Sequence, residues 1–175
     1  MTRTHTIYKS PLSLFTSSHR RSILFGLMIV VGNLIFMCGV FGQTNRWTGH
    51  AMDNLWNSGG NWTIGVPTSA HNVLIDTIAN ILVNANPTID SLTINNSATV
   101  SFTPTGLNKT ITIGAGGCVI GSGSVLTLKG TVSSSKMTLA FSGTNVPMSI
   151  AGTLIITDVL GGSVFNLSSS ITTVT

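Results

Sequence analysis

The sequence predicts an all-β protein, built as a single-stranded parallel β-solenoid (β-helix) with a tryptophan-rich N-terminal cap. Two features of the composition point away from helices. Charged residues make up only 7% of the 175 residues, whereas roughly a quarter is usual in a soluble domain, and the sequence contains no glutamate. The residues that normally cover helix surfaces are therefore scarce, while the abundant Gly, Ser, Thr, Asn, Val and Ile favour short strands and tight turns.

A third observation is a series of short β-type triplets, several of which read apolar-Thr-apolar. This alternation is the period of two that is typical of a strand with one buried face. Gly, Ser, Asn or Pro residues separate the triplets and predict turns between them. The triplets occupy residues 73–75, 81–83, 92–94, 111–113, 126–128, 137–139 and 154–156.

The spacing of the triplets is compatible with two architectures. The last five begin at residues 92, 111, 126, 137 and 154, which is a degenerate repeat rather than a strict one. We favour the solenoid because the triplets resemble one another and because Gly, Ser and Asn turns let neighbouring coils stack closely. Low charge fits this reading, since like charges stacked about 4.8 Å apart repel. Closely spaced short strands also suit a β-sandwich, which is the alternative.

The N-terminal segment has the pattern of an export signal. An apolar run over residues 23–41 follows Arg20 and Arg21, as a signal helix requires. Val40 and Gly42 suit the −3 and −1 positions of a cleavage site, so residues 1–42 are expected to be removed as a signal peptide. The alternative is an uncleaved membrane anchor, since about 18 apolar residues can just span a bilayer.

We therefore expect three regions, with any membrane contact confined to the first. Residues 1–42 form the signal peptide, residues 43–69 form the tryptophan-rich cap, and residues 70–175 form the solenoid repeats. Cys38 lies in the apolar run after Phe36 and Met37, which are too large for a lipoprotein attachment site. We interpret Cys38 as one more apolar residue of the signal.

The charge distribution argues against a nucleic-acid partner. The net charge of +4 comes from four basic residues that precede the apolar run. From residue 43 onward four bases balance four acids. A nucleic-acid footprint would need bases clustered on a folded face.

All three tryptophans lie between residues 46 and 67, in an arrangement that is similar to a known family. The segments Trp47-Thr48-Gly49, Leu55-Trp56-Asn57, Gly60-Asn61-Trp62 and Val66-Pro67 resemble the opening module of large surface proteins of Bacteroidetes and related bacteria. Residues 91–100 (SLTINNSATV) resemble the β steps that follow that opening. The resemblance implies a secreted, repetitive, adhesin-like β-helix, often followed by a C-terminal sorting domain for type IX secretion. No such domain precedes Thr175, so we expect a truncated chain.

Trp47, Trp56 and Trp62 are the candidate ligand-binding residues. They could form an aromatic platform for sugar rings, or they could close the open first coil, as every solenoid requires. Their setting among Gly and Asn turns favours the cap. In that case the side chains of Asp53 and Asn61 are expected to satisfy the backbone of the turns.

No catalytic, cofactor or metal site is expected. The acids Asp53, Asp76, Asp90 and Asp158 are isolated in sequence, whereas a glycosidase needs two carboxylates across one bond. His50 and His71 lie 21 residues apart without a metal-ligand motif. Cys118 has no partner in the mature chain and is expected to be buried as a small hydrophobe.

The sequence thus favours a non-catalytic, exported cell-surface or adhesin-like structural module. The alternative is a carbohydrate-binding or carbohydrate-active β-helix protein. The corresponding partners are extracellular glycans or other surface proteins.

Overall fold

The computed structural model describes residues 42–131, 135–157 and 164–166 of the chain. The expected signal segment up to Phe41 lies outside these residues, as does Asp158. Within the described part, no helix is long and apolar enough to cross a membrane.

The described residues form strands joined by short turns, with a single turn of 3-10 helix at Gly59–Asn61 and no α-helix. Every pair of neighbouring strands among them is parallel. The strands are β1 (Gln43–Arg46), β2 (His71–Ile75), β3 (Ala79–Val83), β4 (Thr88–Ile94), β5 (Thr99–Pro104), β6 (Lys109–Ile120), β7 (Val125–Lys129), β8 (Met137–Phe141), β9 (Met148–Ile150), β10 (Thr153–Thr157) and β11 (Val164–Asn166).

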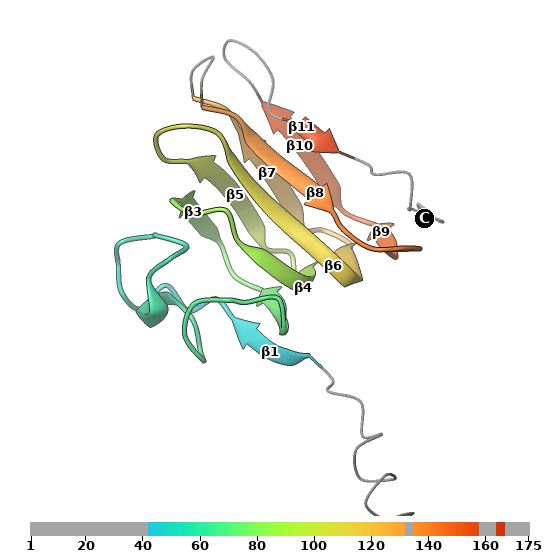
Figure 1. The fold of residues 1–175 in the computed structure, drawn as a ribbon, viewed down its shortest axis with the longest axis horizontal. Helices are drawn as coiled ribbons and strands as arrows, with labels where there is room; N and C mark the ends of the chain where they lie inside the picture. The colour runs from blue at the N-terminus through green and yellow to red at the C-terminus, as the bar shows by residue number, and fades with distance from the viewer. Residues whose placement is uncertain (1–41, 132–134, 158–163, 167–175) are drawn as a thin grey trace, which may run out of the picture. The chain divides into compact units, whose positions relative to one another are not determined.

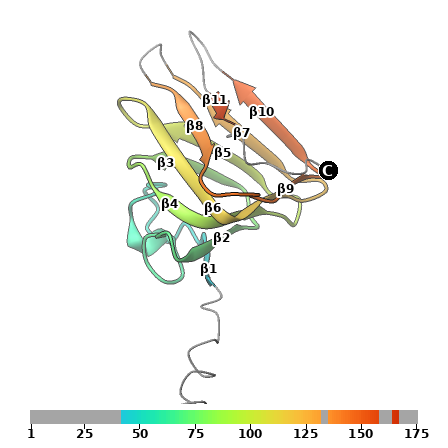
Figure 2. The ribbon, with the colours of Figure 1, turned by 45° about the vertical axis from the view of Figure 1, so that its right-hand side comes forward.

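The strands build two sheets that face each other (Figures 1 and 2). The longer sheet has the order β1-β2-β4-β6-β8-β11, with β9 also paired to β6, and the shorter sheet has the order β10-β7-β5-β3. Successive strands alternate between the sheets for most of the chain, so the backbone winds as a parallel β-solenoid of about four turns. The predicted fold class is confirmed, and the β-sandwich alternative is wrong because parallel pairing needs this winding.

The coils lengthen along the axis, which explains the irregular spacing of the triplets. Val73, Leu92, Cys118 and Met148 are register partners in neighbouring strands. Successive coils at this position are therefore 19, 26 and 30 residues long. Triplets from different faces alternate along the sequence, so the distance between consecutive triplets is not the length of a coil.

Part of the extra length lies at one position in the longer sheet, and the rest lies in the turns between strands. In β4 a single residue, Asp90, separates the partners Ile89 and Ser91, whereas β6 places residues 114–116 between the matching positions. In the next coil residues 142–147 lie between β8 and β9. The first half of β6 consequently pairs with β8 and the second half pairs with β9.

The interior consists of columns of apolar side chains that run along the axis. In the shorter sheet, Ile81, Phe102 and Leu128 form one column, and all three are completely buried. The apolar-Thr-apolar triplets behave as predicted: Leu92 and Ile94 point inward while Thr93 stays half-buried on the outer face. Each coil buries its inward residues against the coils on either side, so the apolar contacts accumulate along the solenoid.

Asparagine side chains connect neighbouring coils where β3, β5 and β7 turn into the next strand. Asn86 Oδ1 accepts a hydrogen bond of 2.9 Å from the Thr110 amide. Asn108 Oδ1 accepts one of 2.8 Å from the Lys136 amide, one coil further on. These bonds occupy backbone donors at strand ends, which would otherwise lack a partner in the ladder.

Candidate functional site

The first coil, residues 43–70, closes the lower end of both sheets. Strand β1 pairs with β2 at the end of the longer sheet. On the opposite side, the Leu82 amide donates to Asn54 O at 2.8 Å and the Trp56 amide donates to Leu82 O at 2.9 Å. The backbone edges of β2 and β3 are therefore both covered by this coil, which is the tryptophan-rich cap that the sequence predicts.

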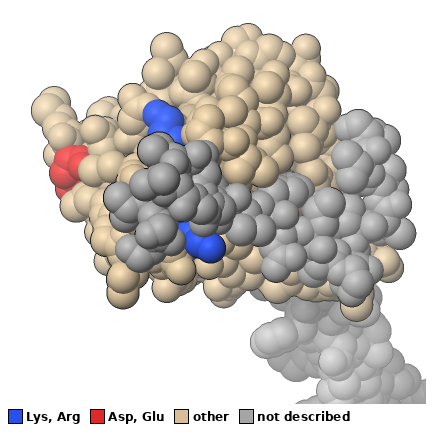
Figure 3. All heavy atoms as spheres, turned by 90° about the horizontal axis from the view of Figure 1, so that it is seen from above, with Lys and Arg blue, Asp and Glu red and all other residues tan. Residues whose placement is uncertain are grey.

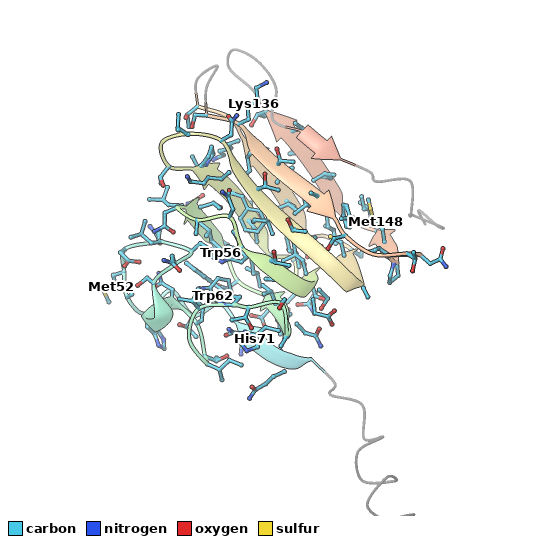
Figure 4. The ribbon with its side chains drawn as sticks, in the orientation of Figure 1. Met52, Trp56, Trp62, His71, Lys136 and Met148 are labelled. Carbon is cyan, nitrogen blue, oxygen red and sulfur yellow. The ribbon has the colours of Figure 1, made fainter. Side chains whose placement is uncertain are left out.

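The three tryptophans pack against one another inside the cap, and Figure 4 shows two of them, Trp56 and Trp62. Trp47 and Trp56 each lie edge-on to Trp62 with ring centroids 4.9 Å apart. Trp56 also contacts Phe102 of β5, with ring centroids 5.8 Å apart. The Trp62 indole N–H donates a buried hydrogen bond of 2.8 Å to Trp56 O, which fixes the orientation of that ring.

Polar side chains hold the cap loop around this aromatic cluster. Asn61, fully buried, accepts from the Ala51 amide at 2.9 Å and donates to both Asp53 Oδ1 and Leu55 O. Asp53 Oδ1 also accepts from the Leu55 amide at 2.9 Å, and this bond lowers the pKa of Asp53 from its ordinary value. The expectation that Asp53 and Asn61 satisfy turn backbones is confirmed.

Asn45 has the same role on the opposite side of the cap. It points inward from β1 at the position where Val73 stands in the next strand, and it is fully buried. Its Nδ2 donates to Gly65 O at 2.7 Å, and its Oδ1 accepts from the Ile64 amide at 3.3 Å. A buried amide with these partners ties residues 63–65 to the open end of the solenoid.

A polar pocket of about 360 Å³ opens on the surface of the cap. Three separate parts of the chain form it. The first is the end of β1 with the residues that follow it, the second is residue 63, and the third is the turn between β2 and β3. We refer to it as the cap pocket. Its lining residues are Arg46, Trp47, Thr48, His50, Thr63 and Thr77.

The charged group of the cap pocket is held in place by an ion pair. Arg46 Nε donates to Asp76 Oδ1 at 2.8 Å, and the side chains are 55% and 17% exposed, respectively. The terminal nitrogens of Arg46 have no partner within the described residues. The Arg46 amide donates to Thr63 Oγ1 at 3.0 Å, so both the backbone and the side chain of Arg46 are anchored.

The structure places the predicted tryptophans in the core rather than on the surface. Trp56 is completely buried, and Trp47 and Trp62 are each only 4% exposed. A sugar ring stacks on an open aromatic face, and none of the three offers one. Trp47 forms one wall of the cap pocket.

Sequence reasoning missed the cap pocket because its residues carry no shared motif. Arg46, Thr63 and Thr77 lie 14 to 17 residues apart in successive segments, and only the closure of the first coil brings them together. The structure places His50, for which the sequence predicts no metal-binding role, in this pocket. His71 instead accepts a hydrogen bond of 3.0 Å from the Thr68 amide through Nδ1.

The described acids serve structural contacts on different elements. Asp53 holds the cap loop, Asp76 pairs with Arg46, and Asp90 Oδ1 accepts a hydrogen bond of 3.2 Å from the Gly116 amide. No group of three or more His, Cys, Asp or Glu side chains that could hold a metal ion occurs in the part of the chain that the structure covers. Cys118 is a buried free thiol, as expected.

A second hollow of about 300 Å³ lies on the outer face of the longer sheet. It is lined by side chains of β1, β2 and β4, among them Asn72, Ser91 and Thr93. Ser91 Oγ donates to Asn72 Oδ1 at 2.8 Å, so these polar groups bind each other.

Comparisons with protein-family models, with curated proteins and with solved structures find no match for this chain.

Proposed function

We propose that the chain is a non-catalytic structural module of an exported cell-surface protein, in which the solenoid acts as a rigid spacer. The observation that carries this proposal is the architecture of the described residues, a stack of parallel coils with a closed first coil. Such a stack has a continuous interior and a surface formed largely by turns and polar strand faces. This arrangement suits a protein that presents parts of its surface at a distance from an attachment point.

The placement of the acids supports a non-catalytic role. General acid-base catalysis needs carboxyl groups within reach of one reacting bond. Asp53, Asp76 and Asp90 instead each bind a structural partner, on three different turns or strands. In the structure the three carboxylates therefore stabilise the local conformation of the chain.

Two features support export. The resemblance of the cap segments to the opening of bacterial surface proteins rests on residues that the structure shows to form a folded cap. In addition, Gln43, the residue that would follow signal cleavage, is the first residue of β1, the first strand among the described residues.

The test is the location and the N-terminus of the native protein. Intact cells are treated with a membrane-impermeant amine reagent, and the chain is then isolated and analysed by mass spectrometry. We expect modification of the exposed Lys129 and an N-terminus at Gln43, as free glutamine or as its cyclised form. An unlabelled chain that retains Met1 in the cytoplasmic fraction would contradict the proposal.

Gly42 takes part in a hydrogen bond that signal cleavage would remove. Asn72 Nδ2 donates to Gly42 O at 2.7 Å, and a Cβ at residue 42 would lie 2.8 Å from Asn72 Oδ1. Cleavage after Gly42 removes this carbonyl and leaves the Asn72 amide to bind water. We therefore expect a chain produced from Gly42 to be slightly more stable than one produced from Gln43, by about 1 kcal/mol.

A further inference from the structure

We infer that the cap pocket binds a neutral saccharide unit, with Arg46 and the threonine hydroxyls as its hydrogen-bonding groups. Of the predicted aromatic platform only Trp47 lines this pocket, and the inference does not depend on the structural role proposed above. It rests on the size of the pocket, its polar lining and the balance of its charges.

The size of the cap pocket fits a small ligand. Its volume of about 360 Å³ lies at the lower end of the range of roughly 300–1,000 Å³ that is usual for small-molecule sites. One or two sugar rings can occupy such a space. A long polymer would contact it only through a terminal or a protruding unit.

The lining offers hydrogen-bonding groups that match a polyhydroxylated ligand. Thr77 is exposed, and its hydroxyl has no partner within the described residues, so it is free to donate and to accept. Thr48 and Thr63 each already donate one hydrogen bond and accept one within the protein, so each keeps one acceptor position, and the terminal nitrogens of Arg46 are donors. Trp47 supplies an apolar wall, and its contact with Trp62 keeps that wall rigid.

The charge balance selects a neutral ligand. Asp76 binds Arg46 Nε at 2.8 Å from outside the lining, so it compensates the positive charge while leaving the terminal nitrogens accessible. A phosphate or carboxylate ligand would be repelled by this carboxylate and would meet a guanidinium whose charge is already compensated. Asp76 thus acts as a positioning residue that holds the guanidinium plane and sets the specificity.

The pocket is also organised before a ligand arrives. The Arg46 backbone is fixed by β1 pairing and by Thr63, and the cap loop is fixed by Asn61. Little conformational entropy remains to be lost on binding, which favours measurable affinity from a small contact area.

The experiment is a titration of the chain that begins at Gln43 with methyl glycosides of glucose, galactose, mannose and N-acetylglucosamine. Two-dimensional NMR spectra are recorded at each step. We expect saturable shifts of the Arg46 Nε–H and the Trp47 indole N–H signals for at least one neutral glycoside. Glucuronic acid, as the charged counterpart, should bind more weakly than the matched neutral sugar.

Two variants and a matched control locate the site. Thr77→Val removes the free hydroxyl and should weaken binding roughly tenfold. Thr93→Val makes the same change on the outer face of β4 and should leave binding unchanged. Asp76→Ala frees the guanidinium and should reverse the preference, so that glucuronic acid then binds more tightly than the neutral glycoside.

Each variant is first checked for an unchanged melting temperature, which is expected because Thr77, Thr93 and the ion pair lie at the surface. Absence of shifts with every glycoside overturns the inference. Binding that is equally strong in Thr77→Val and Thr93→Val also overturns it, because the sugar then binds elsewhere. If Asp76→Ala leaves the preference for the neutral sugar intact, the charge-balance argument is wrong.

Discussion

Trp56 illustrates how much of the cap depends on single side chains. It is completely buried, lies between Trp62 and Phe102, and thereby joins the cap to β5. Its indole nitrogen is buried without a hydrogen-bond partner among the described residues. The contribution of Trp56 is therefore one of packing, and it should be sensitive to lost volume.

We predict that Trp56→Ala lowers the free energy of unfolding by about 3–5 kcal/mol, the usual cost of truncating a large buried aromatic side chain. Trp56→Phe keeps a ring against Trp62 and should lose clearly less, since no hydrogen bond is removed. Chemical denaturation monitored by circular dichroism measures both. Equal stability of Trp56→Ala and the wild type would show that the cap does not depend on this packing.

Cys118 provides a pH-dependent test of the interior. It stands between Leu92 and Met148 in an inward column, and burial raises the pKa of its thiol to about 12. The pKa in the folded chain is therefore above that of an unfolded chain, roughly 8.5. The stability linked to the neutral thiol is fully present below about pH 8.5 and is lost as the pH rises through 12.

We predict that the wild type loses up to about 1.4 kcal/mol per pH unit more than Cys118→Ala between pH 9 and 12. The difference between the two proteins isolates the contribution of the thiol, because every other side chain is the same in both. Urea denaturation at several pH values gives the comparison. Parallel pH profiles, or rapid reaction of the native thiol with a disulfide reagent at pH 8, would contradict the buried position.

At the scale of single residues, the sequence predicted which side chains are buried better than it predicted which side chains line the cap pocket. The inward residues of the triplets, the burial of Cys118 and the turn-binding roles of Asp53 and Asn61 all follow from local patterns. The cap pocket does not, because its lining depends on where three turns meet in space.

Among the strands, those with alternating apolar residues were predictable and those without were not. All seven triplets lie within strands. Strand β1 (QTNR) contains only polar residues, and its single buried side chain is Asn45. Its strand character comes from hydrogen bonding to β2, which no local pattern reveals.

The second half of β6 was missed for a related reason. The stretch Gly114-Ala115-Gly116-Gly117 reads as a turn, whereas the structure continues the strand through it. Gly116 and Gly117 allow close approach of neighbouring coils: Gly117 lies against the Pro147 backbone with φ of +82°, and Pro147 O accepts from the Cys118 amide at 3.0 Å. The glycines accommodate the extra residues of the longer coil.

A comparison of two glycines with similar φ angles measures how much stability depends on this close approach. Gly106 has φ of +76° with open space around it, whereas a Cβ at Gly117 would collide with Pro147 O. We predict that Gly106→Ala costs about 1–2 kcal/mol, from the left-handed backbone alone. Gly117→Ala should cost clearly more, because the β6–β9 contact must also open. Equal losses in the two variants, measured by thermal or chemical unfolding, would show that the coils can move apart freely.

In the folded body as a whole, stability comes from stacking rather than from charge. The described surface carries only scattered charged side chains, seen as small separate spots in Figure 3. The described acids all precede residue 91 and the described lysines all follow residue 108. The single ion pair among the described residues, Arg46 with Asp76, is more than half exposed on the arginine side and contributes little. Parallel ladders and apolar columns remain as the main cohesive interactions.

This architecture makes the first coil a requirement for solubility. Without it, β2 and β3 would expose unpaired backbone groups at the ends of both sheets, and the inward faces of Val73, Ile75 and Ile81 would meet water. Exposed strand edges next to apolar surface favour association with other chains. The sequence predicted such a cap from the tryptophans, although not the two sets of edge hydrogen bonds through which it acts.

We predict that a chain shortened to begin at Ala70 self-associates, whereas a chain that begins at Gln43 does so less at the same concentration. The shortened chain loses the β1–β2 ladder and the bonds of Asn54 O and the Trp56 amide to Leu82. Size-exclusion chromatography with light scattering measures the difference. Trp56→Phe in the longer chain is the control, since it perturbs the cap interior but keeps both covered edges and should not increase association. A shortened chain that is as monodisperse as the longer one, with the same unfolding midpoint, would show that the first coil is dispensable and that the edges of β2 and β3 are protected in some other way.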